Sequence, residues 1–146
     1  TRSIHEYNAV KTLYFSSKFK PENGEYIHLY PCDDLMNNIA IPTCVSGSYS
    51  ESGDHLISVT IIENDLPEID LINNVQKRLR TYYGGGESDY QFLKYIEIKE
   101  GTLCQRVGHF DKPKHEQDNI FIIGEQGTNG SIEGAVLSGL NVANFI

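Results

Sequence analysis

The residues best suited to chemistry in this 146-residue chain lie near its C-terminal end, in the glycine-rich segment 124–131. Three glycines punctuate the segment, so its backbone can turn sharply and approach a ligand closely. Four apolar residues, 120–123, precede the segment, and apolar residues at helical spacing follow Ser131. A helix beginning there would direct its unpaired N–H groups and the positive end of its dipole at the turn. The pattern therefore predicts a site for an anionic group.

A second candidate is Lys11, which lies in an apolar stretch near the other end of the chain. Residues 9–15, AVKTLYF, are rich in β-branched and aromatic residues and predict a strand. Because alternate residues of a strand share a face, Lys11 shares one with Leu13 and Phe15. An ammonium group on an apolar face has to reach solvent, pair with an acid or serve a ligand. Two interpretations stay open: a lysine that snorkels from an edge strand, and one that serves a ligand.

Other reactive residues lack the spacing that known chemistry requires. His109 and His115 are six residues apart with no third ligand nearby, so no metal site is predicted. The three cysteines, Cys32, Cys44 and Cys104, are far apart in sequence and are expected to be buried free thiols. No Gly-x-Ser-x-Gly motif is present, and hydrolysis therefore has no support.

Composition limits the partners of the chain. A formal net charge of -8 and a pI near 5.0 argue against binding to nucleic acid or to an anionic membrane surface. No apolar run approaches the length of a membrane span, and no signal peptide opens the chain. A cytoplasmic location is the expectation.

The elements before residue 111 predict an α+β layer with a mostly antiparallel sheet and one long helix. Strands are expected at residues 9–15, 26–30, 55–62 and 90–98, with an irregular or edge strand within 38–49. The turn at residues 21–24 is expected to join the first two strands as a hairpin. The helix is expected to begin near Leu66 and end near Tyr83, with Asp65 as its N-cap.

The chain changes character after a polar segment at residues 111–118, which is expected to be a linker. Residues 1–110 would form one domain, and residues 119–146 would add a strand and helix to a different α/β domain. The strand at 120–123 is expected to be buried on both faces, as in a parallel sheet. Small residues recur every four positions in the following helix, and this stripe is expected to be buried against another element: Ala135, Gly139 and Ala143.

The C-terminal run IFIIGEQGTNGSIEGAVLSGLNVANFI resembles the FAD-contacting motif of the flavin-containing amine oxidase superfamily, which also includes protoporphyrinogen oxidases and phytoene desaturases. The resemblance rests on three features, an apolar strand with a following acid, a turn, and a helix of small residues. In this sequence they are Ile123-Gly124-Glu125, Glu133-Gly134-Ala135 and Ser138-Gly139. An ordinary closing strand and helix of an α/β domain is the alternative interpretation.

The resemblance implies roles for individual residues. It implies that Glu125 bonds the ribityl region of FAD, and that amides near Ser131 and Ile132 face the pyrimidine edge of the flavin. The implied cofactor-binding set is Gly124, Glu125, Ser131, Ile132, Glu133 and Ala135. Several amine oxidases also carry a lysine at the start of the matching strand, close to flavin N5, which implies a catalytic role for Lys11.

The implied function is that of the C-terminal portion of an FAD-dependent oxidoreductase that transfers hydride from a small-molecule substrate to flavin. No Gly-x-Gly-x-x-Gly fingerprint occurs in the sequence, so an N-terminal FAD-binding portion of the same enzyme is the expected partner. This chain alone is accordingly expected to bind FAD weakly or not at all. A homo-oligomer is compatible with the sequence. The alternative is a stand-alone, non-catalytic α+β binding or interaction module.

Overall fold

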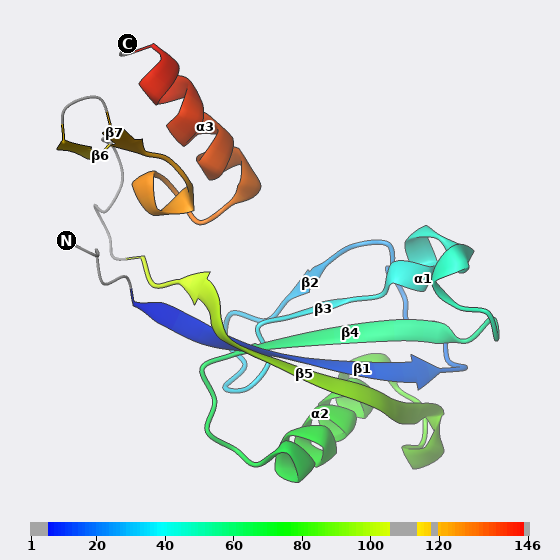
Figure 1. Cartoon of the computed structure of the whole chain (residues 1–146). Helices are drawn as coiled ribbons and strands as arrows, with labels where there is room; N and C mark the ends of the chain where they lie inside the picture. The colour runs from blue at the N-terminus through cyan, green and yellow to red at the C-terminus, as the bar shows by residue number, and fades with distance from the viewer. Residues whose placement is uncertain (1–5, 106–113, 118–119, 145–146) are drawn as a thin grey trace. The chain divides into compact units, whose positions relative to one another are not determined.

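The computed structural model describes residues 6–105, 114–117 and 120–144 (Figure 1). The chain divides into two compact units. One contains Ala9–Lys99, and the other contains Thr1–Asn8 and Glu100–Ile146. Among the described residues, no helix is both long enough and apolar enough to cross a membrane.

A five-stranded sheet with the order β2-β3-β4-β1-β5 organises the first unit. Its strands are β1 (Tyr7–Ser17), β2 (His28–Leu29), β3 (Asn38–Ala40), β4 (His55–Ile62) and β5 (Tyr90–Leu103). Antiparallel pairs join β1 to β4, β3 to β4 and β2 to β3, and Figure 1 shows β5 running opposite to β1. The predicted antiparallel α+β fold is therefore confirmed.

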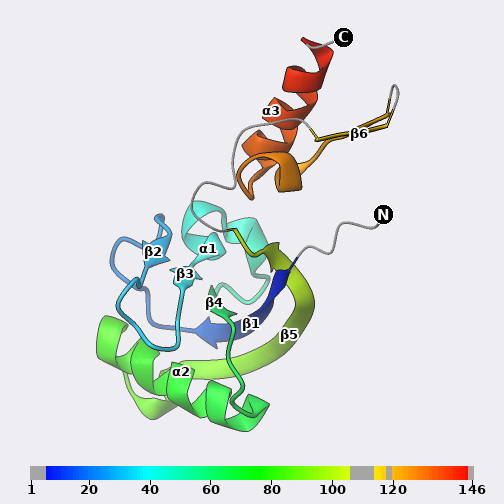
Figure 2. The same ribbon diagram turned by 90° about the vertical axis from the view of Figure 1, so that its left-hand side faces the viewer.

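The core of this unit lies between the sheet and α2 (Glu68–Tyr83). Figure 1 and Figure 2 both show α2 lying along one face of the sheet. Three residues at helical spacing, Leu71, Val75 and Leu79, are fully buried on the helix. Alternate residues of β1 and β4 meet them from the sheet, as the period of two requires: Leu13, Phe15, Ile57, Val59 and Ile61.

The expected hairpin between the first two strands is wrong. Strand β2 contains only two residues and pairs with β3 instead, with His28 opposite Ile39. Strand β1 has no free edge for β2, because β4 and β5 flank it on both sides. The strand expected within residues 38–49 is confirmed only for Asn38–Ala40, since the short helix α1 (Pro42–Val45) follows with proline in its first turn.

The expected N-cap of α2 is also wrong. The residue at the N-cap position is Pro67, and no side chain caps the first turn. Asp65 lies two residues before the N-cap position, and Asn64 instead accepts a hydrogen bond from Leu66 N at 2.8 Å through its Oδ1 atom. The C-terminal end is as expected, with Gly84 in the left-handed region at φ 82°.

The second unit contains an antiparallel strand pair and the helix α3 (Ile132–Ala143). Strands β6 (Lys114–Gln117) and β7 (Ile120–Ile122) form the pair, so part of the segment expected to be a linker is a strand. The expectation of a parallel sheet around residues 120–123 is wrong within the described residues, because β6 is the strand that pairs with β7 there. Ile120 is 56% exposed, so β7 is not buried on both of its faces as expected.

The helix after Ser131 is confirmed, but the expected buried stripe is displaced by one position. The buried residues of α3 are Gly134, Ser138 and Val142. Ala135 and Gly139 are half-buried, and Ala143 is exposed. The displacement has a physical reason, since the turn before α3 packs against Gly134 and Ser138 and so selects that side of the helix.

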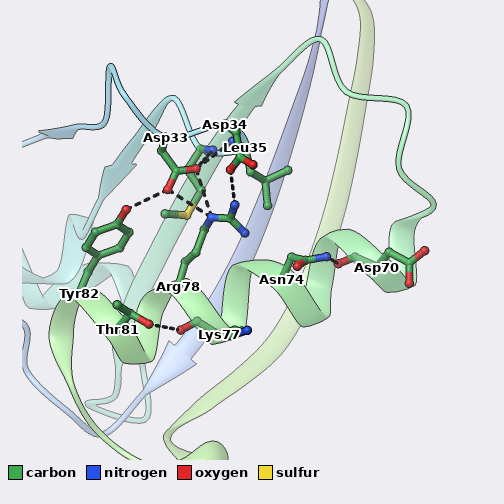
Figure 3. A network of polar contacts seen from close by, with 10 residues as sticks. Asp33, Asp34, Leu35, Asp70, Asn74, Lys77, Arg78, Thr81 and Tyr82 are labelled. Atoms are coloured by element: carbon green, nitrogen blue, oxygen red, sulfur yellow. Dashed lines mark hydrogen bonds and ion pairs between the residues drawn. The ribbon is translucent and has the colours of Figure 1, made fainter.

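A buried carboxylate ties α2 to the segment before β3 (Figure 3). Asp33 accepts hydrogen bonds from Leu35 N and Met36 N at 2.8 Å each, from Tyr82 Oη at 2.9 Å and from Arg78 Nε at 3.2 Å. Burial raises the pKa of Asp33, but these bonds and the Arg78 charge outweigh it and hold the pKa below its ordinary value. The ionised carboxylate is therefore the form that stabilises this contact.

We expect Asp33→Asn to lower the free energy of unfolding by about 2 kcal/mol, because it weakens several charge-assisted bonds to a side chain that is only 5% exposed. Asp34→Asn is the matched control, since that side chain is 87% exposed and pairs with the same Arg78. It should leave stability nearly unchanged. Because the pKa of Asp33 is lowered by folding, its stabilisation is present above the unfolded value of about 3.9 and is lost as the pH falls through the lower folded value. Urea unfolding as a function of pH measures both effects, and equal losses in the two variants would contradict the assignment.

Candidate functional site

The glycine turn begins with Gly124, two residues after the end of β7. Its φ of 141° and ψ of -175° are accessible to glycine and strained for other residues. The Gly124 N–H donates to Ser138 Oγ at 3.2 Å, so a side chain of α3 fixes the point where the turn starts. A single 3₁₀ turn, Glu125–Gly127, follows. The start of the turn and the body of α3 are thus joined directly.

Ser131 begins α3 as a true N-cap. Its side chain accepts from Gly134 N at 2.9 Å, and its carbonyl accepts from Ala135 N at 3.0 Å. Ile132 and Glu133 follow Ser131, and neither of their N–H groups has an acceptor within the described residues. These two groups lie at the positive end of the helix dipole. The first turn of α3 is therefore able to receive an anionic or polarised oxygen atom.

The turn is closely packed onto α3 at Gly134. A Cβ atom at this position would overlap the backbone carbonyl oxygen of Asn129 and lie 2.8 Å from Thr128 Oγ1. The Thr128 hydroxyl donates to Gly134 O at 2.5 Å. Glycine at 134 is required here by the close approach of two backbone segments.

One residue that the sequence did not point to braces the turn from outside. Gln105 follows β5 and donates through Nε2 to Thr128 O at 2.8 Å, while its Oε1 accepts from Gly130 N at 2.8 Å. One side-chain amide thus forms hydrogen bonds with two backbone groups of the turn. A lone glutamine 23 residues before Thr128 has no sequence pattern that would have revealed this role.

Several apolar side chains among the described residues of this unit are exposed to solvent. Ile132 is 88% exposed at the tip of α3, and Ile120 and Ile123 at β7 are each more than half exposed. Three more exposed apolar residues lie along the helix: Val136, Leu137 and Leu140. Glu125 is half-buried, and its carboxylate has no hydrogen-bond partner among the residues that the structure describes. The described residues of this unit therefore present a carboxylate and two N–H groups without partners among themselves, together with exposed apolar side chains.

The structure settles part of the question about Lys11. The residue is 8% exposed, on the same face as Leu13 and Phe15, as predicted. Strand β1 is internal, between β4 and β5, so the interpretation as an edge-strand lysine is wrong. The Lys11 ammonium donates to the backbone carbonyl oxygen of Asn64.

A strained loop holds that carbonyl in place. Glu63, which precedes Asn64, has a positive φ of 45°, and its N–H donates to Ala9 O at 3.1 Å. The loop from β4 to α2 is thereby closed over the start of β1. Lys11 therefore satisfies a main-chain acceptor, and its role toward a ligand stays a prediction.

Other candidate chemistry is sparse. Among the described residues, no group of three or more His, Cys, Asp or Glu side chains converges on a common point. His109 lies outside the described residues. All three cysteines are free, but the expectation that they are buried is wrong, since Cys32 is exposed and Cys44 and Cys104 are half-buried.

Comparison with known proteins identifies the family. The family described as flavin containing amine oxidoreductase matches residues 6–146, which is nearly the whole chain. The chain belongs to this family. No curated protein matches the chain closely enough to be counted as a relative.

A solved structure has the same fold. It is the crystal structure of an oxidoreductase from Methanosarcina mazei, with a TM-score of 0.65 and 15% sequence identity. The match covers 96% of this chain and 35% of the other. The chain thus spans about a third of the length of that oxidoreductase. At this identity the similarity concerns the fold.

The predicted cofactor-binding residues gather in one place within the C-terminal unit. Gly124 and Glu125 begin the turn, and Ser131 caps the helix that Ile132 and Glu133 open. Ala135 is half-buried one residue after the closely packed Gly134. Lys11 belongs to the other unit.

Proposed function

We propose that this chain is the C-terminal portion of an FAD-dependent amine oxidoreductase, with residues 119–146 forming part of the FAD-binding domain and residues 1–110 the substrate domain. Membership of the flavin-containing family supports the proposal. The observation that carries it is the braced turn that leaves the N–H groups of Ile132 and Glu133 open at the start of α3. This arrangement fits an electron-rich edge of a planar cofactor.

The residues of this chain would act by position and charge. FAD, when bound, supplies the hydride acceptor for a small-molecule substrate. The first turn of α3 would stabilise negative charge that develops at the pyrimidine edge of the ring system, through two N–H groups and the helix dipole. Glu125, which has no partner within the described chain, would accept a hydrogen bond from a ribityl hydroxyl. Lys11 is proposed as a catalytic residue near flavin N5.

The remaining FAD contacts are proposed to come from another portion of the same enzyme. The sequence contains no dinucleotide fingerprint, and the chain spans 35% of the similar oxidoreductase. The exposed apolar residues of α3 and β7 would pack against that portion. We also propose that the intact enzyme is cytoplasmic.

The test concerns Glu125 in the intact flavoprotein that contains this chain. We expect Glu125→Ala to lower FAD affinity by about tenfold, because a charge-assisted hydrogen bond contributes about 1.5 kcal/mol. Titration calorimetry of the apoprotein with FAD measures the change. Glu51→Ala is the control, since Glu51 is exposed in the other unit and should leave affinity unchanged.

Three results would contradict the proposal or one of its parts. If the intact protein purified without flavin and did not bind added FAD, the non-catalytic interaction module would be favoured. Submicromolar binding of FAD by the 146-residue chain alone would refute the view that most contacts come from elsewhere. Equal affinity of the Glu125→Ala and Glu51→Ala proteins would remove Glu125 from the site.

A further inference from the structure

A cavity of about 350 Å³ lies in the first unit, between the loop after β1, strand β2 and the C-terminal end of α2. Four of its lining residues are aromatic: Phe19, Tyr30, Tyr82 and Tyr83. Phe19 is 40% exposed and Tyr82 is 45% exposed, so aromatic surface is open to solvent. The volume falls within the range of small-molecule sites.

A chain of hydrogen bonds fixes the polar groups of the cavity. His28 Nε2 lies 2.8 Å from Asn23 O, and a carbonyl oxygen only accepts, so Nε2 carries the proton. The other ring nitrogen, Nδ1, forms a hydrogen bond with the Tyr83 hydroxyl at 2.5 Å. The Tyr30 hydroxyl lies 3.1 Å from that of Tyr83 and is hydrogen-bonded to it, which completes the series. These bonds hold His28 and the two tyrosine rings in place.

The two tyrosines of this hydrogen-bonded series, Tyr30 and Tyr83, stay neutral. Burial is the main cause that raises the pKa of Tyr83 far above its ordinary value. Burial also raises the pKa of Tyr30, despite the hydrogen bond with Tyr83. Both rings therefore keep the neutral phenol form, in which the face of the π-system is negative.

The charges around the cavity favour a cation. Glu22 lines it, and neither lysine nor arginine does. The nearby Arg78 is occupied, because it pairs with Asp33 and Asp34 (Figure 3). Tyr82 and Tyr83 form the last turn of α2, where the helix dipole is negative. Three independent features, the aromatic walls, the carboxylate and the helix end, thus attract the same sign of charge.

The cavity is remote from Lys11 within the same unit. Lys11 is bonded to Asn64, in the loop before the first residue of α2, whereas the cavity is at the last turn. Since an α-helix rises 1.5 Å per residue, the 16 residues of α2 separate its two ends by roughly 24 Å. The cavity is therefore a separate site from the one proposed for Lys11.

We propose that this cavity binds a small organic cation with an alkylated ammonium head group, which lies against the aromatic walls with Glu22 as its counter-ion. The site does not depend on the proposed flavin chemistry and is tested without flavin. Alkylated ammonium ions are bound by aromatic side chains because their charge is spread over a surface that water solvates poorly.

The probes are choline and its uncharged carbon isostere, 3,3-dimethylbutan-1-ol. Titration of the full chain with each, followed by NMR, should show saturable binding of choline and an upfield shift of its methyl protons against the ring faces. The isostere should bind at least about fivefold more weakly, since it has the same shape without the cation–π attraction.

Two substitutions at Tyr82 separate the ring from its hydroxyl. Tyr82→Phe and Tyr82→Leu both lose the bond from Tyr82 to Asp33 at 2.9 Å, but only Tyr82→Leu loses the ring. We expect choline affinity to survive in Tyr82→Phe and to fall by about 3- to 10-fold in Tyr82→Leu. Glu22→Gln should weaken choline binding about 2- to 5-fold, with an effect that shrinks as salt is added.

Equal affinity for choline and its isostere would overturn the proposal, as would equal affinity of the two Tyr82 variants. Absence of saturable choline binding by the folded chain would do the same. Circular dichroism of each variant verifies that it is folded before titration.

Discussion

Gly134→Ala is expected to destabilise the C-terminal unit by about 2–3 kcal/mol, although helix propensity alone favours alanine by about 1 kcal/mol. The added methyl group would overlap the backbone carbonyl oxygen of Asn129 and crowd Thr128 Oγ1. Backbone atoms cannot move aside as a flexible side chain can, so the turn would separate from the helix. The measurement is hydrogen exchange of the α3 amides, which reports the local opening of this unit.

Gly139→Ala is the matched control, because it makes the same change on the same helix. A Cβ atom there meets Ile123 Cδ1 at 3.9 Å, which is an ordinary van der Waals contact. Protection of the α3 amides should be unchanged or increased by up to about 1 kcal/mol. Equal protection in Gly134→Ala and wild type would show that the turn is not packed against the helix in the way described.

The parts of the fold that the sequence predicted are those that local patterns determine. Strand β4, His55–Ile62, was predicted to the residue because apolar residues alternate along it between polar boundaries. The C-terminal end of α2 was predicted because Gly84 follows Tyr83 and glycine commonly ends a helix. Each of these signals is complete within a short segment, so no knowledge of tertiary contacts is needed.

The pairing of strands was not predictable in the same way. The turn at residues 21–24 suggested that β1 and β2 are neighbours, whereas β1 pairs with β4, whose residues are 38 to 52 positions away in sequence, from Ser17↔His55 to Val10↔Ile62. Pairing depends on which strands bury the larger apolar face together, and β2 has only two residues to contribute. A local turn signal cannot outweigh that difference.

The sequence predicted the segment that contains the candidate site, but it did not predict the distant residue that holds the segment in place. The glycines and Ser131 indicated the turn and the helix start, because each residue type has a local conformational role. Gln105 was missed, since its contribution is two hydrogen bonds to main-chain groups of a distant segment. The buried stripe was displaced by one residue for a similar reason. Periodicity defines a set of small positions, and the contacts of the turn select among them.

Lys11→Met tests whether the buried lysine has a role beyond its own contact. In the chain itself we expect a loss of about 1–3 kcal/mol in the free energy of unfolding, because the Asn64 carbonyl loses its donor in a site that is only 8% exposed. If the lysine also serves the proposed flavin chemistry, flavin reduction or reoxidation in the intact enzyme should slow while FAD content is retained. Urea unfolding measures the first effect, and stopped-flow absorbance of both half-reactions measures the second.

Lys94→Met is the control for removing one positive charge, since Lys94 is exposed on β5 and should change neither stability nor rates. Lys11→Arg separates the two roles further, because a guanidinium group retains a donor for Asn64 O but is wider and cannot be deprotonated. It should recover most of the stability and little of the rate. If Lys11→Met lowers stability but leaves both half-reactions at the wild-type rate, the ammonium group only ties β1 to the loop before α2. Lys11 would then be removed from the proposed catalytic residues, while Glu125 and the start of α3 would stay as the candidate cofactor contacts.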